Sequence, residues 1–228
     1  MILASVPSIV TRLFPSYIWR FNEPEKRVYL TFDDGPIPET TNWILSVLKE
    51  YGAKATFFCV GDNVRKYPYL YEDIIKNGHS VGNHTYNHLN GRKTETKEYV
   101  KNVRKAEHFI QSNLFRPPHG MIKSAQYQDL KEDYNIVMWN VLSLDYERRI
   151  SPQQCLRNVT SNASPGSIIV FHDSVKSWKN LQFALPMTLE FLSRQGYSFP
   201  AIQLESNYIQ KTELIKWGFG SSMAVKRI

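Results

Sequence analysis

Two pairs of side chains in the sequence could hold one metal ion. Asp33 and Asp34 stand side by side where a strand-like stretch, residues 28–33, ends. His84 and His88 are four residues apart, so both imidazoles would lie on one face of a helical turn. Asp-Asp-Gly-Pro alone is typical of an ordinary turn, and a lone histidine is more often structural. A histidine pair in an Asn-rich stretch favours a ligand pair, and either aspartate could supply the carboxylate that the ion still needs.

Three further polar side chains stand at predicted strand ends. Arg116, Asp145 and His172 each come at or just after the end of an apolar stretch, and Asp173 follows His172. Each has a plain alternative: a surface arginine, a helix-capping aspartate and a turn histidine. In barrels built from βα units, catalytic groups gather at the carboxyl ends of the strands. This shared position predicts one site and assigns the aspartate pair to a metal site.

Strand-like and helix-like segments alternate along the chain, which predicts one α/β domain with a parallel sheet, open or closed into a barrel. Strands are predicted at 28–33, 55–60, 79–82, 114–116, 136–141, 167–172 and, with a weaker pattern, 197–202. Helices are predicted between Thr40 or Thr41 and Gly52, at 67–77, 94–112 and 124–132, from Ser151-Pro152 onward, and at 180–195.

Composition excludes some classes of protein. The 228 residues carry a formal net charge of +7, with 42% hydrophobic and 21% charged residues, which is ordinary for a globular domain. No apolar run is long enough to span a membrane. The charge suits an anionic partner, but Lys and Arg are scattered, so we expect no nucleic-acid partner. The two cysteines, Cys59 and Cys155, provide no disulfide framework.

Taken in order, these residues resemble the motifs of the polysaccharide deacetylases of carbohydrate esterase family 4, which share a homology domain with chitooligosaccharide deacetylases. The resemblance runs from about residue 27 to about residue 200. The first two motifs are highly specific, and the other three add support through their order. The matching stretches are TFDDG (31–35), His84-Thr85-x-x-His88, Arg116-x-Pro118-x-Gly120, Asp145-Tyr146 and Val170-Phe171-His172.

The resemblance implies both a fold and an activity. The fold would be a single-domain, distorted (β/α) barrel of about seven parallel strands. The activity would be that of a bacterial hydrolase that uses a metal-activated water to remove N-acetyl groups from an amino-sugar-containing glycan. Such a substrate would be of chitooligosaccharide or peptidoglycan type, and would contain N-acetylglucosamine. We expect a monomer whose partner is this acetylated glycan.

By the same resemblance, Asp34, His84 and His88 would bind one divalent metal ion, expected to be zinc, which lowers the pKa of water to about 7. Asp33 would be the general base and His172 the general acid. The other catalytic residues would be Arg116 and Asp145, a buried pair that holds the base and the acid in place. The substrate-binding residues would be Pro118, His119, Tyr146 and Val170.

Three residues depart from the family pattern. Leu142 stands where an aspartate is usual, Tyr146 where a tryptophan is usual, and His119 where a tyrosine or phenylalanine is common. None of them removes a metal ligand or the base. The backbone N–H of His119, expected to hold the developing oxyanion, does not depend on the side chain. The departures therefore bear on substrate preference.

Three other functions fit parts of the pattern. An O-acetyl esterase acting on a xylan-like glycan lies within the same family. A non-catalytic carbohydrate-binding barrel would have no reason to keep Asp33. Two histidines and one carboxylate also suit the non-haem iron(II) oxygenases, which need neither a second aspartate nor an acid histidine opposite it.

The resemblance also divides the chain into three parts. Residues 1–26 would be a lead-in segment, residues 27–203 the catalytic domain, and residues 204–228 an extension packed on that domain or trailing it. No basic segment precedes the apolar start, residues 1–10, so we do not interpret it as a signal peptide. The sequence therefore predicts a cytoplasmic protein, although the family often acts on extracellular glycans.

Overall fold

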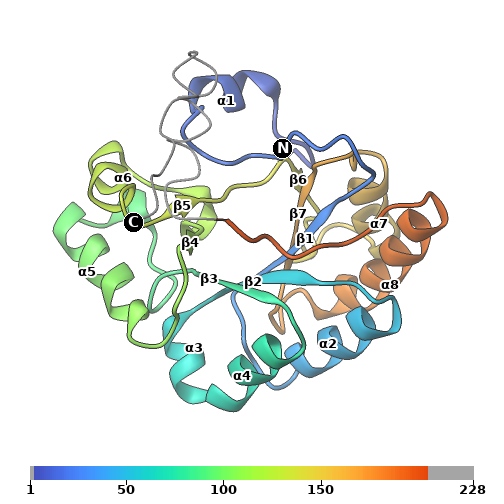
Figure 1. Cartoon of the computed structure of the whole chain (residues 1–228), viewed down its shortest axis with the longest axis horizontal. Helices are drawn as coiled ribbons and strands as arrows, with labels where there is room; N and C mark the ends of the chain where they lie inside the picture. Colours follow the sequence, from blue (N-terminus) through green and yellow to red (C-terminus); the bar gives the residue numbers. More distant parts are fainter. Residues whose placement is uncertain (1–2, 205–228) are drawn as a thin grey trace, which may run out of the picture.

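The described part of the chain, residues 3–204 of a computed structural model, is built on one curled parallel sheet (Figure 1). The spatial order of its seven strands is β5-β4-β3-β2-β1-β7-β6. The strands are β1 (Tyr29–Asp33), β2 (Ala55–Cys59), β3 (Ser80–Asn83), β4 (Leu114–Phe115), β5 (Asn135–Ile136), β6 (Val141–Leu142) and β7 (Ile168–His172). The predicted fold class, a distorted (β/α) barrel of seven parallel strands in one domain, is confirmed.

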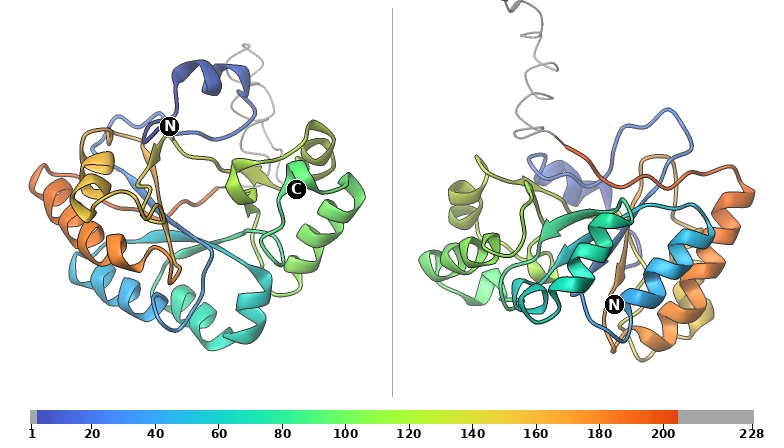
Figure 2. Two further views of the ribbon diagram at one scale, coloured as in Figure 1. Left: turned by 180° about the vertical axis from the view of Figure 1, so that it is seen from behind. Right: turned by 60° about the horizontal axis from the view of Figure 1, so that its bottom comes forward.

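Helices cover the outside of the curl, as the views in Figures 1 and 2 show. They are α1 (Ser8–Leu13), α2 (Thr41–Glu50), α3 (Gly61–Lys66), α4 (Pro68–Lys76), α5 (Thr96–Glu107), α6 (Ser124–Leu130), α7 (Pro152–Thr160) and α8 (Trp178–Arg194), with 3-10 turns η1 (Gly91–Lys93) and η2 (Pro118–Gly120). One face of α2 is buried, including Ile44, Val47 and Leu48. Helix α2 thus supplies an apolar stripe that covers the sheet.

Apolar side chains fill both faces of the sheet. Between the sheet and the helices, the ring of Phe32 stacks on those of Phe57 and Phe171, with centroids 5.1 and 6.0 Å apart. Phe58 belongs to a separate cluster with Ile168. Neighbouring strand residues point to opposite faces, so Phe57 and Phe58 separate the two clusters. Burial on both faces explains why these strands read as continuous apolar runs.

The predicted strand at 136–141 is wrong as a single strand. Its two ends are β5 and β6, which lie at opposite edges of the sheet. Five residue steps separate Ile136 from Val141, and an extended chain covers roughly 3.3–3.6 Å per residue, so the curl must bring the edges within about 18 Å of each other. Ile18 pairs with Val137 in this crossing. A run that is apolar at both of its ends carries no signal that it changes edge.

The predicted strand at 197–202 is also not a strand of the sheet. It makes only an isolated bridge, between Ser198 and Arg27. The segment lies across the start of the central strands, where Val28 N–H donates to the carbonyl of Ser198 and Lys54 N–H donates to that of Phe199. Pro200 has no N–H to continue a ladder, which explains why the apolar pattern did not form a strand.

Two helix predictions also need correction. Helix α3 was not predicted. Val64 is its one buried apolar side chain, so the sequence shows no helical period of apolar residues there. Helix α5 ends at Glu107 rather than at 112. Ile110 is still buried, from the turn that follows the helix, so the apolar period outlasts the helical backbone.

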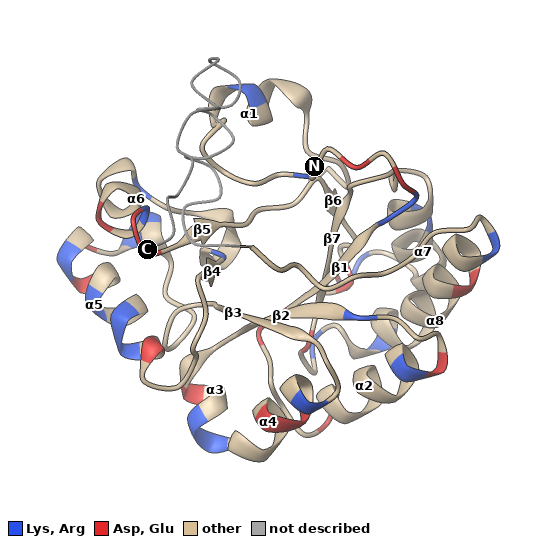
Figure 3. Cartoon of the chain, in the orientation of Figure 1, with Lys and Arg blue, Asp and Glu red and all other residues tan. Residues whose placement is uncertain are grey.

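Among residues 3–204, no helix combines the length and the apolar character needed to cross a membrane. Figure 3 shows Lys and Arg spread over the outer helices and mixed with Asp and Glu, as the sequence indicated. The predicted extension at 204–228 lies, apart from residue 204, outside the described residues.

Candidate active site

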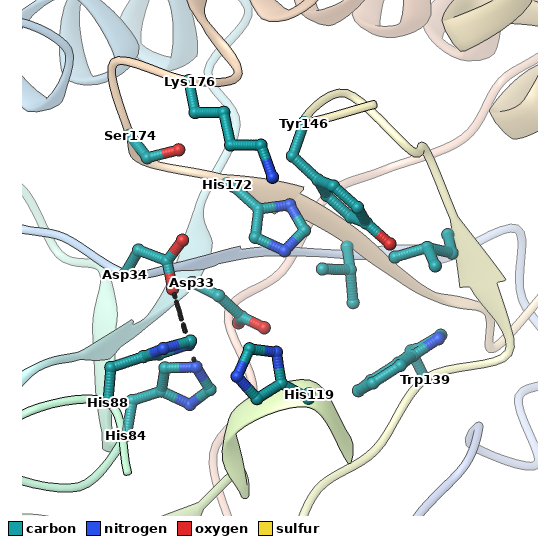
Figure 4. A pocket seen from close by; sticks show the side chains of 12 residues that line it. Asp33, Asp34, His84, His88, His119, Trp139, Tyr146, His172, Ser174 and Lys176 are labelled. Atoms are coloured by element: carbon teal, nitrogen blue, oxygen red, sulfur yellow. Dashed lines mark ion pairs between the residues drawn. The ribbon is translucent and has the colours of Figure 1, made fainter. Parts of the chain in front are cut away.

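The predicted site residues converge at the carboxyl end of the sheet. Asp33, the last residue of β1, stands in register with His172, the last residue of β7. His84 directly follows β3. A cavity of about 380 Å³ opens here (Figure 4). It is lined by Asp33, Asp34, His84, His88, His119, Trp139, Leu142, Tyr146, Val170, His172, Ser174 and Lys176.

Asp34, His84 and His88 form a candidate metal centre. One ligand atom from each lies within 4.8 Å of the others. Asp34 Oδ1 is 3.2 Å from His88 Nε2 and 3.8 Å from His84 Nε2. The two histidines meet through a turn and not through the predicted helical face: Thr85 and His88 both have positive φ angles, of 65° and 58°.

The protonation of this group suits a cation. His84 Nδ1 lies 2.7 Å from the carbonyl of Arg116, which only accepts, so Nδ1 carries the proton and the lone pair of Nε2 faces the cavity. Burial lowers the pKa of His84 to about 4, which keeps it neutral. Burial alone would raise the pKa of Asp34, but His88, His172 and His84 outweigh it and hold that pKa well below its usual range.

Asp34 Oδ1 is buried, and apart from the histidine nitrogens 3.2 and 3.8 Å away it has no hydrogen-bond partner among the described residues. A buried carboxylate oxygen without a donor is costly. A divalent cation would satisfy this oxygen together with the two imidazole nitrogens, and this N,N,O donor set is one that zinc accepts. The residues present therefore fit the metal that the sequence implied.

Asp33 is held by a buried arginine. Arg116 is fully buried, and its Nη1 donates to Asp33 Oδ1 over 2.7 Å and to Thr31 Oγ1 over 2.8 Å. The other guanidinium nitrogens donate to the carbonyls of Val137 and Met138, both at 3.0 Å. Every side of the guanidinium is thus occupied, and the orientation of the carboxylate is fixed.

His172 has its own carboxylate. Its Nδ1 lies 2.7 Å from Oδ1 of the buried Asp145, and its backbone N–H donates to Asp145 Oδ2 over 2.7 Å. Burial alone would lower the pKa of His172, but the carboxylate of Asp145, assisted by Asp34 and Asp33, raises it to about 9. The ring is therefore an imidazolium at neutral pH, with Nε2 free to face the cavity.

The turn that carries both aspartates is braced from two sides. Asn63 Nδ2 donates to the carbonyl of Asp34 over 2.7 Å. On the other side the buried carboxylate of Asp173 accepts hydrogen bonds from the hydroxyls of Thr40 and Thr41. The backbone N–H of Asp173 donates to the carbonyl of Asp33 over 2.7 Å. Thr40, at the predicted helix start, therefore directs its side chain to Asp173 and not to the helix.

The predicted substrate-binding residues divide into two groups. Tyr146, Val170 and His119 line the cavity, and the ring of Tyr146 stands edge-on to that of His172 with centroids 4.8 Å apart. His119, with a φ of 59°, packs its ring edge-on against His88 at 4.7 Å. Pro118 is buried and is not among the residues that line the cavity.

Three lining residues were missed from the sequence: Trp139, Ser174 and Lys176. Trp139 lay inside the supposed strand at 136–141, and it faces the cavity because the chain crosses between the sheet edges there. Ser174 and Lys176 follow His172, so their closeness to a predicted strand end was the available signal.

Comparison with known proteins agrees with this geometry. A family model described as polysaccharide deacetylase matches residues 21–137. A peptidoglycan-N-acetylglucosamine deacetylase of Bacillus cereus is 34% identical over 192 residues, which are 81% of this chain and 90% of that protein. The chain belongs to the polysaccharide deacetylase family. The predicted resemblance is therefore confirmed.

Solved structures of the family show the same fold. A crystal structure of a peptidoglycan N-acetylglucosamine deacetylase superposes with a TM-score of 0.76 at 29% identity, and covers 86% of this chain and 95% of its own. A CE4 family pseudoenzyme from Bacillus anthracis superposes with a TM-score of 0.71 at 27% identity, over 82% of this chain and 68% of its own. The polysaccharide deacetylase fold thus occurs in active and inactive proteins, so activity must be argued from the site.

Proposed function

We propose that this chain is a metal-dependent deacetylase that removes N-acetyl groups from a glycan containing N-acetylglucosamine, with residues 27–203 as the catalytic domain and 1–26 as a lead-in. The observation that carries the proposal is the placement of Asp33 and His172. They stand side by side in register on β1 and β7, each held by a buried counter-ion, beside the candidate metal centre. Amide hydrolysis needs such a base for the attacking water and such an acid for the leaving nitrogen.

Asp34, His84 and His88 would hold one zinc ion, because their donor atoms converge and the buried Asp34 Oδ1 has no hydrogen-bond partner in residues 3–204 beyond the two histidines. Bound there, zinc supplies a Lewis acid and lowers the pKa of water to about 7. All the proton transfers are carried by side chains of the protein.

Asp33 takes the proton of the attacking water, in the orientation that Arg116 imposes on its carboxylate. The backbone N–H of His119 stabilises the oxyanion, and Tyr146 and Val170 surround the acetyl methyl. His172 then donates its Nε2 proton to the leaving nitrogen while its Nδ1 stays with Asp145. The C–N bond breaks and gives acetate and a free amino sugar.

The charge on His172 favours an amide over an ester as the substrate. An amine must be protonated as it leaves, and an imidazole with a pKa of about 9 holds that proton at neutral pH. A sugar alkoxide, which is the leaving group of an ester, needs this protonation less. A purely carbohydrate-binding barrel would need neither the buried Arg116–Asp33 pair nor the Asp145–His172 pair, since buried ion pairs seldom add stability.

The test is a measurement of two products. The zinc-loaded protein is incubated with N-acetylglucosamine oligomers, peptidoglycan glycan strands and O-acetylated xylan, and both acetate and free amine are measured. We expect equal amounts of acetate and amine from the first two substrates. Acetate without amine, from xylan alone, would make the protein an esterase, and no acetate from any substrate would overturn the proposal.

A further inference from the structure

Among the described residues that line the cavity, Lys176 is the charged side chain that the proposed mechanism leaves without a role. Asp33 and His172 each have a buried counter-ion, and Asp34 belongs to the candidate metal centre. Within residues 3–204, no carboxylate oxygen lies within 4 Å of the Lys176 ammonium group. The cavity therefore carries an unpaired positive charge at its exposed rim.

The ammonium group is aimed at the reacting end of the cavity. Figure 4 shows the Lys176 side chain extending from the loop after β7 toward Tyr146 and His172. Its Nζ lies 5.1 Å from the centre of the Tyr146 ring. That ring in turn stands edge-on to His172, the proposed acid. A group bound by Lys176 would thus be a close neighbour of the acetamido group that is cleaved.

The loop beneath Lys176 is built rigidly. Ser177 is buried, and its hydroxyl hydrogen-bonds to the carbonyls of His172 at 2.5 Å and Ser174 at 2.8 Å, while its N–H donates to Ser174 at 3.1 Å. The next residue, Trp178, packs its ring edge-on against Trp43 of α2, with centroids 5.0 Å apart. The backbone that carries the lysine is therefore fixed relative to His172.

We infer that Lys176 binds a carboxylate of the substrate, so that the preferred glycan is acidic, with a carboxylate on the sugar next to the N-acetylated one. This inference rests on the proposed function and narrows its substrate class. A lysine is a compact charge on a flexible stem, which suits a carboxylate on a mobile substituent such as a lactyl ether. Glycan strands of peptidoglycan carry such ethers on alternate sugars, whereas N-acetylglucosamine oligomers have no carboxylate.

The test compares Lys176→Met with Lys179→Met. Methionine keeps most of the apolar stem and removes the charge. Lys179 is an exposed lysine three residues further on that does not line the cavity, so it controls for net charge. The substrates are neutral N-acetylglucosamine oligomers and peptide-free glycan strands of equal length that carry lactyl carboxylates.

The quantity compared is kcat/KM on the acidic strands divided by kcat/KM on the neutral oligomers. We expect Lys176→Met to lower this ratio by roughly fivefold, mainly through a higher KM for the acidic strands, because one partly exposed charge pair is lost. Lys176→Glu should lower the ratio further, and Lys179→Met should leave it unchanged. The preference of the parent should also weaken between about 0.05 and 0.5 M salt, as screening shortens the range of the charge. An unchanged ratio in Lys176→Met, or an equal fall in Lys179→Met, would overturn the inference.

Equilibrium binding of the same two glycans to the zinc-loaded proteins separates this inference from the proposed function. A preference for the acidic strand that depends on Lys176 supports the inference even if no acetate is released. If acetate is released but neither binding nor turnover depends on Lys176, the inference is wrong and the proposed function stands.

Discussion

The two sides of the cavity neutralise their charges in different ways. On one side the protein supplies every counter-ion: Arg116 lies 2.7 Å from Asp33, and Asp145 lies 2.7 Å from His172. On the other side Asp34 and two histidine nitrogens are directed at one another, and Asp34 Oδ1 has no further hydrogen-bond partner among the described residues. This difference shows which charged side chains the fold itself positions and which depend on a bound ligand. The first side should survive removal of the metal, and the second should not.

Loss of a metal ligand should have the largest effect. His84→Ala or His88→Ala removes one of three donors, so zinc content should fall from about one ion per chain to near zero, and acetate release should become undetectable. Metal analysis after dialysis, together with the acetate assay, measures both. His108→Ala, an exposed histidine away from the cavity, is the matched control and should behave as the parent. Full zinc occupancy in both ligand variants would contradict the assignment.

Variants of the two adjacent aspartates should respond differently to excess zinc. Asp33→Asn keeps the shape of the side chain but cannot take a proton, so turnover should fall roughly 10²–10⁴-fold with metal content unchanged. Asp34→Asn removes the anionic ligand, so it should weaken zinc binding first and turnover as a consequence.

Added zinc should partly restore Asp34→Asn and have no effect on Asp33→Asn. Equal rescue of the two variants, or near-parental activity of Asp33→Asn, would mean that the two sides of the cavity do not divide the work as proposed.

Removal of the proposed general acid, His172, should lower turnover by a somewhat smaller factor. In His172→Ala, water can still deliver a proton to the leaving amine, so we expect kcat to fall roughly 10²-fold with KM and zinc content little changed. Steady-state kinetics and metal analysis on the same preparation make the measurement. A change confined to KM would assign His172 to substrate binding instead.

The smallest effect concerns the pH dependence of stability in the metal-free protein. The pKa of His172 is raised from 6.5 to about 9 in the folded state, so its pair with Asp145 contributes fully below about pH 6.5. That contribution is lost as the pH rises to about 9. The free energy of unfolding should therefore decrease by roughly 2–3 kcal/mol across this window relative to Asp145→Asn, which lacks the pair. Urea unfolding at both pH values tests this, and parallel profiles for the two proteins would exclude the raised pKa.

Much of the site could be predicted because its residues sit at the ends of buried strands. Asp33 and His172 end the apolar runs that form β1 and β7, so parallel pairing places both at the same end of the sheet. Their meeting depends in addition on the strand order, which puts β7 beside β1. The resemblance added roles that strand ends cannot provide, such as the choice between Asp33 and Asp34. These roles remain predictions until the variants above are measured.

What could not be predicted depends on contacts between distant segments. The run at 136–141 is apolar except for Asn140, so nothing in its pattern reveals that it leaves one edge of the sheet and joins the other. The turn that brings His84 and His88 together depends on positive φ angles at Thr85 and His88, which no periodicity encodes. Lys176 is an exposed lysine in a short loop, and only the structure shows that this loop brings it to the lining of the cavity.

The short crossing between β5 and β6 also positions the proposed base. The carbonyls of Val137 and Met138, which lie in this crossing, are the ones that hold the guanidinium of Arg116, and Arg116 holds Asp33. A substitution that displaced the backbone of the crossing would therefore take two acceptors away from the guanidinium. The orientation of the aspartate thus depends on a segment that supplies no catalytic side chain of its own.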